Sequence, residues 1–443
     1  MQKDFKLIIL VWLPIALIPA FNDFPLFAAV SILRSPSIFP YLLLLPMILI
    51  WFWRVPIYKS SGSSITTFIY VFWGYFFLAF VYNFIFNDLY YGRQGLAFSV
   101  FFGAFITMSF LLVVSLTFQT LDCSIAKMFS CVNNAVLTAS WLMIVYGLIE
   151  LLAKYNSGFY LILNLLEPIF HDRPIGDYFS GNSLRSLSFE PSYLALPLVF
   201  LLGLNFTYLK RKHNMIVAVL LIGLATMSGS RLTSVMLLAS ILLHVIISRG
   251  FSLKMLAYII IFCAPLGFLL ANTISSLLTL DVNQISNIQR YGSYLAGIYL
   301  FMDNFYIGVG FGLGGGFISE YYPEFFYGTY TSLDWVDSKG FGGSFLSWPI
   351  RFLAEAGAVG IGLALCIFIR IITALLKLRR RYARNSVEFK GINSLMTLWF
   401  LLPIASIGVD SYIFLGFWII LGMTLFVIKT DRHTSTSGDT NYE

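Results

Sequence analysis

A charged pair stands at the edge of an apolar segment in the middle of the chain. Arg185 and Glu190 lie in the sequence RSLSFEPSYLAL, which runs from a polar stretch into an apolar helix with Pro191 at its first turn. Ionisable side chains are costly at membrane depth unless they are paired or functional. Next to a helix start, Glu190 would stay ionised, as a general base must. A carboxylate that only caps the helix would give the same pattern.

Three further arginines are predicted to lie on the same side of a membrane as Arg185. Arg231 lies in MSGSRLTS, Arg290 in a long polar segment and Arg351 at the start of a late apolar segment. A guanidinium presents a planar fork of donors that suits phosphate, and it stays charged when partly desolvated. We expect the four arginines to form one site for a diphosphate or a phospholipid headgroup. Snorkelling to the interface, or pairing with nearby carboxylates, is the alternative.

Metal and nucleotide signatures are missing from the sequence. Only His171 of the four histidines falls on the outer side, and no acidic pair with metal-ligand spacing accompanies it. The Gly-rich segment DNFYIGVGFGLGGGF at 303–317 lacks the βαβ context of a nucleotide-binding fingerprint. No Walker motif is present. We therefore expect no cofactor, no metal and no direct coupling to ATP.

The composition is that of a membrane protein. Hydrophobic residues make up 58% of the chain and charged residues 11%, whereas a soluble protein carries about 25% charged residues. Apolar runs long enough to cross a bilayer recur along almost the whole sequence. We predict an all-α polytopic membrane protein with about twelve transmembrane helices. The expected spans are 6–21, 38–53, 66–86, 95–118, 132–153, 192–208, 214–228, 232–248, 255–278, 346–376, 391–409 and 411–429.

Polar segments divide these spans into groups. The first five spans fill 1–153, the next four fill 192–278, and the last three fill 346–429 before a cytoplasmic tail at 430–443. Two long outer loops, 154–191 and 279–345, separate the groups. The first contains NSGFYLILNLLEPIF, an amphipathic stretch suited to the membrane interface. Because both loops are long and neither has a disordered composition, we expect them to be functional.

Lys and Arg gather in short segments on one side of the predicted membrane, such as RKH at 211–213 and KLRRRYAR at 377–384. By the positive-inside rule this side is cytoplasmic and holds both termini. The amino-terminal apolar run lacks a clear cleavage site, so we expect an uncleaved first helix. The four cysteines fall in spans or on the cytoplasmic side, which argues against a disulfide framework.

Four short segments, in this order, resemble the O-antigen polymerase (Wzy-type) and O-antigen ligase superfamily. They are RSLSFEPSYLA at 185–195, SGSRL at 228–232, DNFYIGVGFG at 303–312 and FLAEAGAVG at 352–360. The resemblance covers roughly 180–375. It implies a GT-C-like helical body and metal-independent transfer of undecaprenyl-diphosphate-linked sugars at the outer (periplasmic) face of the bacterial inner membrane. It also implies that Arg185, Arg231 and Arg290 bind the diphosphate, and we add Arg351 as a candidate.

One residue separates the two branches of this superfamily. Ligases resemble one another in a His upstream of the Glu of an E-x-G element, but the position nine residues before Glu355 is Leu346 here. The polymerase is therefore favoured. A polyprenyl diphosphate is already an activated leaving group, and arginines would stabilise the charge that develops on it. Glu190 is the candidate base for the acceptor hydroxyl.

Aromatic residues of the second outer loop could stack on sugar faces, with Tyr321, Tyr322 and Trp335 as candidates. The expected partners are the lipid-linked oligosaccharide, membrane lipid, and a chain-length regulator and flippase of the same pathway, with no nucleic acid. Three alternatives stay open: an O-antigen ligase, a flippase or transporter of lipid-linked oligosaccharide, and another membrane glycosyltransferase. A transporter would spread its polar residues along a path between the two sides, whereas here they gather at one face.

Overall fold

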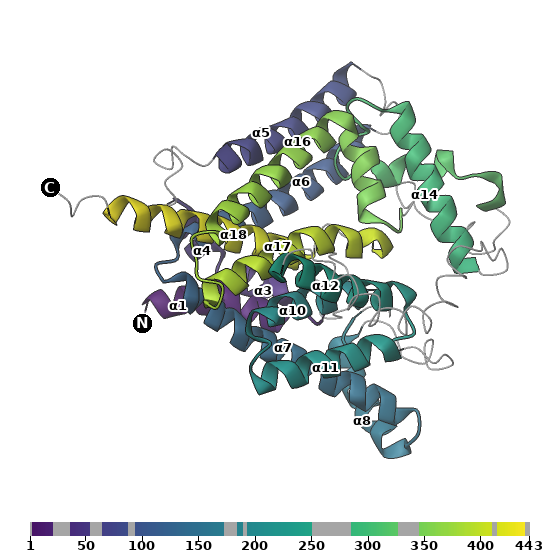
Figure 1. The fold of residues 1–443 in the computed structure, drawn as a ribbon. Coiled ribbons are helices and arrows are strands. Elements are labelled where there is room, and N and C mark those ends of the chain that lie inside the picture. Colours follow the sequence, from purple (N-terminus) through teal and green to yellow (C-terminus); the bar gives the residue numbers. More distant parts are fainter. Residues whose placement is uncertain are drawn as a thin grey trace.

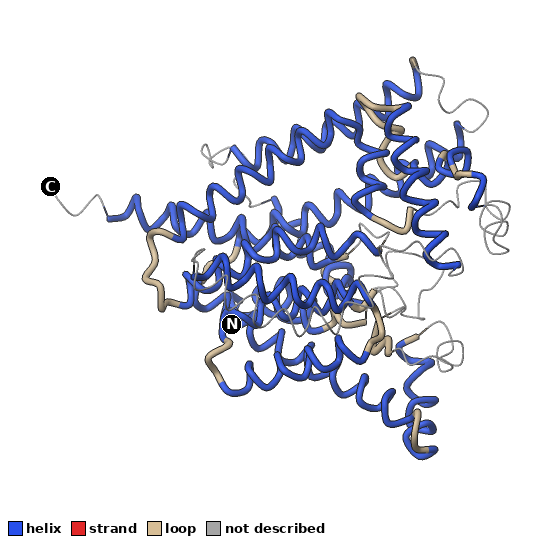
Figure 2. The backbone as a smooth tube through the Cα atoms, turned by 45° about the vertical axis from the view of Figure 1, so that its right-hand side comes forward, coloured by secondary structure: helices blue, strands red, loops and turns tan. Residues whose placement is uncertain are grey.

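All regular structure in the described part of the chain is helical (Figures 1 and 2). The computed structural model describes residues 2–20, 36–53, 64–86, 94–171, 184–188, 193–249, 285–326, 345–409 and 414–438. Within these ranges there is no β-strand. The predicted all-α class is therefore confirmed.

Six described helices are long and apolar enough to cross a membrane. A seventh span is formed if η4–α3 (Pro36–Leu43) and α4 (Leu45–Trp53), which meet at 67°, count as one broken helix. Several long apolar helices in one chain indicate an integral, multi-pass membrane protein. The six are α5 (Ser64–Ile85), α6 (Gln94–Thr117), α7 (Ile125–Ala153), α12 (Arg231–Arg249), α16 (Trp348–Arg379) and α17 (Val387–Ala405).

The remaining expected spans are shorter or broken. The segment 6–21 overlaps α1 (Gln2–Leu7), a π-helical turn η1 (Ile8–Trp12) and α2 (Leu13–Ala16). The segments 192–208 and 214–228 correspond to α10 (Ala195–Asn205) with η6 (Phe206–Tyr208), and to α11 (Lys212–Met227). The last expected span corresponds to α18 (Leu415–Gly438). The expected span 255–278 lies outside the described residues.

The two segments predicted as outer loops both contain helices. The amphipathic stretch of the first forms α8 (Ser157–Phe170), which folds back along α7 so that the rings of Phe170 and Tyr146 lie 5.7 Å apart. The second contains α14 (Ile285–Asp303), followed by short 3-10 turns at Gly314–Gly316, Ile318–Tyr321 and Glu324–Phe326. The segment predicted as the second outer loop therefore contains a helix of 19 residues. Its polar residues make α14 less apolar than the predicted spans.

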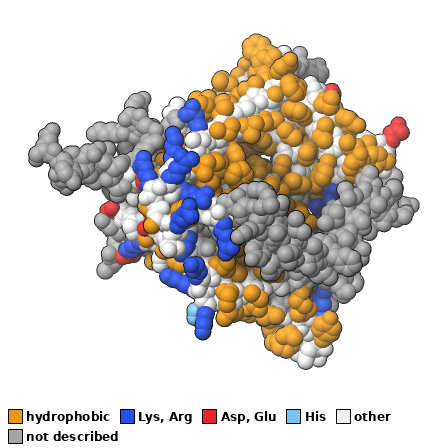
Figure 3. Space-filling model, viewed as in Figure 1, with side chains coloured by type: hydrophobic (Ala, Val, Ile, Leu, Met, Phe, Trp, Pro, Cys, Tyr) orange, Lys and Arg blue, Asp and Glu red, His pale blue; other side chains and the backbone are white. Residues whose placement is uncertain are grey.

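The long helices run between two opposite faces of the molecule, where their ends gather (Figure 1). One face, called here the terminal end, holds α1, the end of α18 and the turns at 209–212 and 380–386 (Figure 1). There Lys429 and Lys6 both donate to the carbonyls that follow α6, at Gln119 and Thr120. The opposite face, the distal end, holds α14, the start of α16 and the end of α17. Basic side chains gather at the terminal end (Figure 3).

Candidate functional site

The distal end brings together segments that are far apart in the sequence. η10 (Ser406–Gly408) closes α17, and a Cβ added at Gly408 would overlap Leu232 and lie 3.3 Å from Nη1 of Arg290. Leu232 directly follows Arg231, the first residue of α12. On the other side, the backbone N–H of Trp348, which begins α16, donates to the Val409 carbonyl at 2.9 Å. Two of the predicted arginines therefore lie on segments that meet at Gly408.

Arg290 presents its guanidinium at this junction. It sits on α14, is half-buried, and hydrogen-bonds the hydroxyl of Tyr294, one turn further along the helix. That hydroxyl in turn donates to the carbonyl of Ile407 at 2.9 Å, which ties α14 to the end of α17. Burial raises the pKa of Tyr294, and the positive charge of Arg290 opposes this shift. Arg290 is therefore a cation held in a defined place.

Arg185 is held differently, because its side chain is fully buried. Its Nη2 donates to Oε1 of Glu167 on α8 at 3.1 Å. The backbone N–H groups of Arg185 and Ser186 donate to the two carboxylate oxygens of Glu150 on α7, at 3.1 and 2.8 Å. The segment also reaches α11, where Leu184 donates to the carbonyl of Ser228. Arg185 thus joins α7, α8 and the turn that precedes Arg231.

The most heavily bonded part of the distal end surrounds Glu355. Its buried carboxylate accepts from the N–H groups of Gly312 and Gly314 at 2.8 and 3.1 Å, and from Nε of Arg351 at 2.8 Å. Gly312 and Gly314 belong to the glycine strap, defined here as residues 304–317. Arg351 keeps 16% of its side chain exposed, whereas Glu355 keeps 2%. Of the ion pair, the Glu355 carboxylate is thus the buried partner and the Arg351 guanidinium is the one that reaches the surface.

The strap crosses α16 where that helix is broken. Gly357 has a φ of +61° and a ψ of −177°, and around it Ala358 and Val359 donate to the carbonyls of Phe305 and Tyr306. The Tyr75 hydroxyl on α5 bridges the two segments, at 3.0 Å from the Ile307 carbonyl and 2.7 Å from the Ala356 carbonyl. These contacts fix α14, and hence Arg290, relative to the start of α16 and Arg351.

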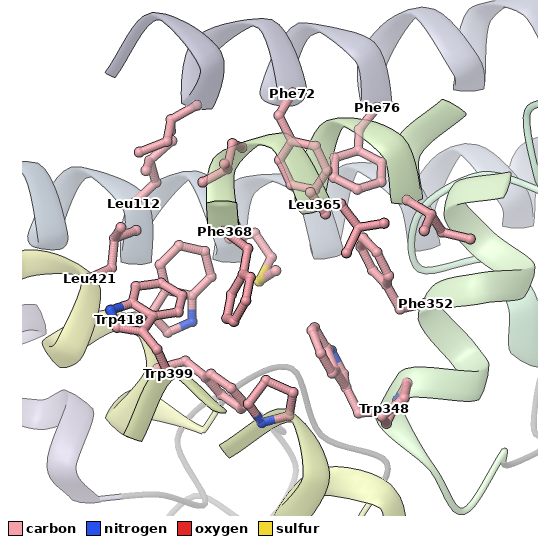
Figure 4. Close-up of a pocket in the computed structure, with 18 of the residues that line it drawn as sticks. Phe72, Phe76, Leu112, Trp348, Phe352, Leu365, Phe368, Trp399, Trp418 and Leu421 are labelled. Carbon is pink, nitrogen blue, oxygen red and sulfur yellow. The ribbon is translucent and has the colours of Figure 1, made fainter. Parts of the chain in front are cut away.

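A long apolar cavity begins at the same place. It has a volume of about 670 Å³ and is lined almost wholly by apolar side chains of α5, α6, α16, α17 and α18. Its lining runs along α16 from Trp348 to Phe368. Figure 4 shows Trp348 and Phe352 on one side of the cavity and Trp399 and Trp418 on the other. Because Trp348 also contacts Val409, the distal end of the cavity adjoins the Gly408 junction.

No family model matches the chain, and no curated protein matches it either. The site must therefore be read from its own geometry. That geometry links the segments of Arg185, Arg231, Arg290 and Arg351 through direct contacts at one end of the helices.

The other predicted site residues are placed less fully. Glu190 and Trp335 lie outside the described residues, and of Arg231 only the backbone is described. Tyr321 is partly exposed in a short 3-10 turn after the strap. The ring of Tyr322 is buried and stacks on Phe326, with 4.0 Å between centroids.

Three carboxylates that organise the distal end were not predicted as site residues. Glu150 is the only acid within α7, and an acid inside an apolar span is itself a signal of a polar role. Glu167 could have been suspected because it is the one charged residue of α8. Glu355 was noted only as a motif residue. The backbone N–H groups that it binds cannot be read from side-chain spacing.

Glu167→Ala should destabilise the protein by about 3 kcal/mol, because it removes the carboxylate partner of a fully buried guanidinium. Thermal unfolding in detergent, followed by the loss of monodisperse protein, measures this effect. Asp4→Asn is the matched control, because the Asp4–Lys127 pair is 59% and 54% exposed. Exposed ion pairs contribute little, so the control should melt like the wild type. Equal midpoints for the two variants would contradict the role given to Glu167.

Proposed function

We propose that the protein is a polymerase that joins undecaprenyl-diphosphate-linked oligosaccharide repeat units into a surface polysaccharide. The reaction would be metal-independent glycosyl transfer at the outer face of the inner membrane. The product would be O-antigen, capsule or another exopolysaccharide. In this proposal the chain crosses the membrane about twelve times, has both termini in the cytoplasm, and exposes the distal end to the periplasm or cell exterior.

One observation carries the proposal: a cation site and a long apolar cavity meet at the Gly408 junction. A polyprenyl diphosphate has the matching parts, a charged head and a long hydrocarbon tail. Arg290 lies against one side of the junction, and Trp348, which lines the cavity, contacts the other. The tail would lie in the cavity while the diphosphate faces the arginines, whose forked donors suit its oxygens.

The orientation is supported by charge. Basic side chains crowd the terminal end, as expected for a cytoplasmic face. Arginines at the distal end run against that rule, so their presence there calls for another reason. Neutralising a diphosphate that leaves during glycosyl transfer is such a reason, because charge develops on the leaving group in the transition state.

Each predicted residue has a distinct part in this proposal. Arg290, Arg231 and Arg351 would contact the diphosphate. Arg185 was expected to bind it too, but because its side chain is fully buried and paired with Glu167, we assign it to holding the segment that leads to Glu190. Glu190 would deprotonate the acceptor hydroxyl. Tyr321, Tyr322 and Trp335 were chosen as sugar-stacking residues, and of these Tyr321 is the described residue with an exposed surface. A chain-length regulator and a flippase would act with the protein in the same pathway.

The test is polysaccharide length in a host deleted for this gene. Single repeat units attached to the final acceptor, and a ladder restored by the wild-type gene, are the expected results. Arg290→Ala should lower turnover about 100-fold or more, as loss of a charge-stabilising donor does, and should leave the ladder absent. Arg384→Ala, a matched arginine exposed at the terminal end, should restore the full ladder.

Other patterns in the same host would point to the alternatives. Complete polymer stranded on the polyprenyl carrier would identify a ligase. Lipid-linked single units retained on the cytoplasmic side would identify a flippase. Membrane abundance of each variant, measured by immunoblot, separates lost activity from lost protein.

A further inference from the structure

A second, smaller pocket opens at the distal end, away from the arginines. It has a volume of about 150 Å³ and lies between the last turn of α5 and the start of the glycine strap. Its polar and aromatic lining comes from Tyr82, Asn83, Asp303, Asn304 and Tyr306. In contrast to the apolar cavity, this pocket thus offers hydrogen-bonding groups and ring faces together.

The exposed groups around the pocket have the chemistry that recognises sugars. Tyr306 leaves 74% of its surface exposed and Tyr82 leaves 44%. A sugar ring presents an apolar C–H face that packs on an aromatic ring, and hydroxyl groups that donate to a carboxylate or bond an amide. Asp303, which is exposed, and Asn304 supply the carboxylate and the amide beside the rings.

Hydrogen bonds within the protein hold the pocket in shape, and a ligand could bind without breaking them. The Asn83 amide donates to the Gly308 carbonyl at 2.8 Å, and the Asn304 amide donates to the Leu300 carbonyl at 3.1 Å. Tyr321 hydrogen-bonds Asp303, and burial together with this bond raises the pKa of Tyr321 to about 12. The hydroxyl therefore stays protonated and orients the carboxylate.

Helix α14 sets the distance between this pocket and the arginines. Arg290 lies near its start and Asp303 is its last residue, so the two are separated by about 20 Å along the axis at 1.5 Å per residue. A substrate anchored by a diphosphate at Arg290 would need several sugar rings to reach Asp303. An oligosaccharide repeat unit has that form, whereas a simple phospholipid headgroup does not.

We infer that this pocket, built from Asp303, Asn304, Tyr306 and Tyr82, is a saccharide subsite that holds one neutral sugar ring of an oligosaccharide. The inference rests on the proposed function in that the oligosaccharide would be part of the lipid-linked repeat unit. The subsite lies remote from the bond being made, and its role is to bind and align the glycan.

The decisive experiment separates the sugar from the lipid diphosphate. The probe is the reducing oligosaccharide released by mild acid from the lipid-linked repeat unit of the natural host. Binding to the purified full-length protein in lipid nanodiscs is followed by saturation-transfer difference NMR. The wild type should bind the probe, whereas Tyr306→Ala and Asp303→Asn should each weaken binding at least about tenfold, the loss of roughly 1.4 kcal/mol.

Matched variants control for folding and for general aromatic effects. Tyr306→Phe keeps the ring and should keep most of the binding. Tyr299→Ala removes an exposed tyrosine of α14 that lies outside the pocket lining, and it should bind as the wild type does. Arg290→Ala should bind the free oligosaccharide normally, because that probe carries no diphosphate.

The outcomes distinguish this inference from the polymerase proposal. If the probe does not bind, or binds Tyr306→Ala and Asp303→Asn as it binds the wild type, the rings belong only to the interfacial aromatic belt and the inference is overturned. The polymerase would still stand if Arg290→Ala abolishes the ladder. If the probe binds through the pocket while gene deletion leaves polymer length unchanged, the subsite stands and the polymerase proposal fails.

Discussion

Gly357→Ala is expected to disrupt the distal end of the protein, whereas Gly362→Ala in the same helix should be harmless. A Cβ at Gly357 would lie 2.5 Å from the Gly308 nitrogen and 2.5 Å from the Ile307 carbonyl carbon. These are backbone atoms, so no rotamer change relieves the contact. The combination of a φ of +61° with a ψ of −177° is one that essentially only glycine adopts, which adds about 1–3 kcal/mol of strain for a residue with a Cβ. We expect a total cost of about 4 kcal/mol or more.

Gly362 provides the matched control because it lies on α16 beyond the break. Nothing comes within 4 Å of a Cβ built there. Alanine is also favoured over glycine inside a helix by about 1 kcal/mol. Thermal unfolding of both variants in detergent measures the contrast, and limited proteolysis should cut Gly357→Ala in the strap. If both variants melt together, α16 is not broken at Gly357 in the way described.

Glu355→Ala is expected to have a comparably large effect through electrostatics. Its carboxylate accepts from Gly312, Gly314 and Arg351. Removing one partner of a buried ion pair costs about 3–5 kcal/mol, and each buried N–H left without an acceptor adds about 1–3 kcal/mol. The strap should detach from α16, and Arg290 and Arg351 should lose their fixed relation. We expect little folded protein and no polysaccharide ladder.

Graded substitutions show whether the charge or the shape of Glu355 matters. Glu355→Gln keeps an oxygen acceptor but loses the charge, so it should melt between Glu355→Ala and the wild type. Glu324→Ala removes an exposed acid in the 3-10 turn Glu324–Phe326 and should leave the midpoint unchanged. A Glu355→Ala protein as stable as Glu324→Ala would show that the carboxylate does not anchor the strap.

The positions of the main helices could be predicted because the bilayer imposes a simple rule. A spanning segment must be apolar along its length and must satisfy its own backbone hydrogen bonds. Helices such as α6 and α7 are therefore recognisable in the sequence as continuous apolar runs. The shorter α10, by contrast, is fully buried among other helices. Hydropathy alone cannot tell such a helix from a span.

The elements outside the apolar runs were harder to predict. α14 carries polar residues such as Gln289, Arg290 and Ser293, so it was too polar to stand out as an apolar segment. The strap contains little regular structure, and its shape depends on contacts with Gly357 and Tyr75 that are distant in sequence. Long-range backbone contacts of this kind leave no local period in a sequence.

That the arginine-bearing segments gather at one end of the helices could be predicted, but the partner of each arginine could not. These arginines stood out because the topology predicted from the sequence places them opposite to the side that the positive-inside rule favours. Which carboxylate each would meet could not be read from spacing. Glu190, five residues from Arg185 in sequence, lies outside the described residues, and within them the Arg185 guanidinium pairs with Glu167 on α8. Only Arg351 and Glu355, one helical turn apart, were close enough in sequence for local geometry to decide.

The break in α16 also sets how deep its charges lie. At 1.5 Å per residue, the 32 residues of Trp348–Arg379 would extend about 48 Å, well beyond a hydrocarbon thickness of about 30 Å. The continuous part from Ala358 to Arg379 is about 33 Å long and matches that thickness by itself. With that continuous part spanning the hydrocarbon, the residues before Gly357 would lie at headgroup level. Arg351 and Glu355 belong to these residues. One helix would thus span the hydrocarbon core while its ion pair stays at the membrane interface.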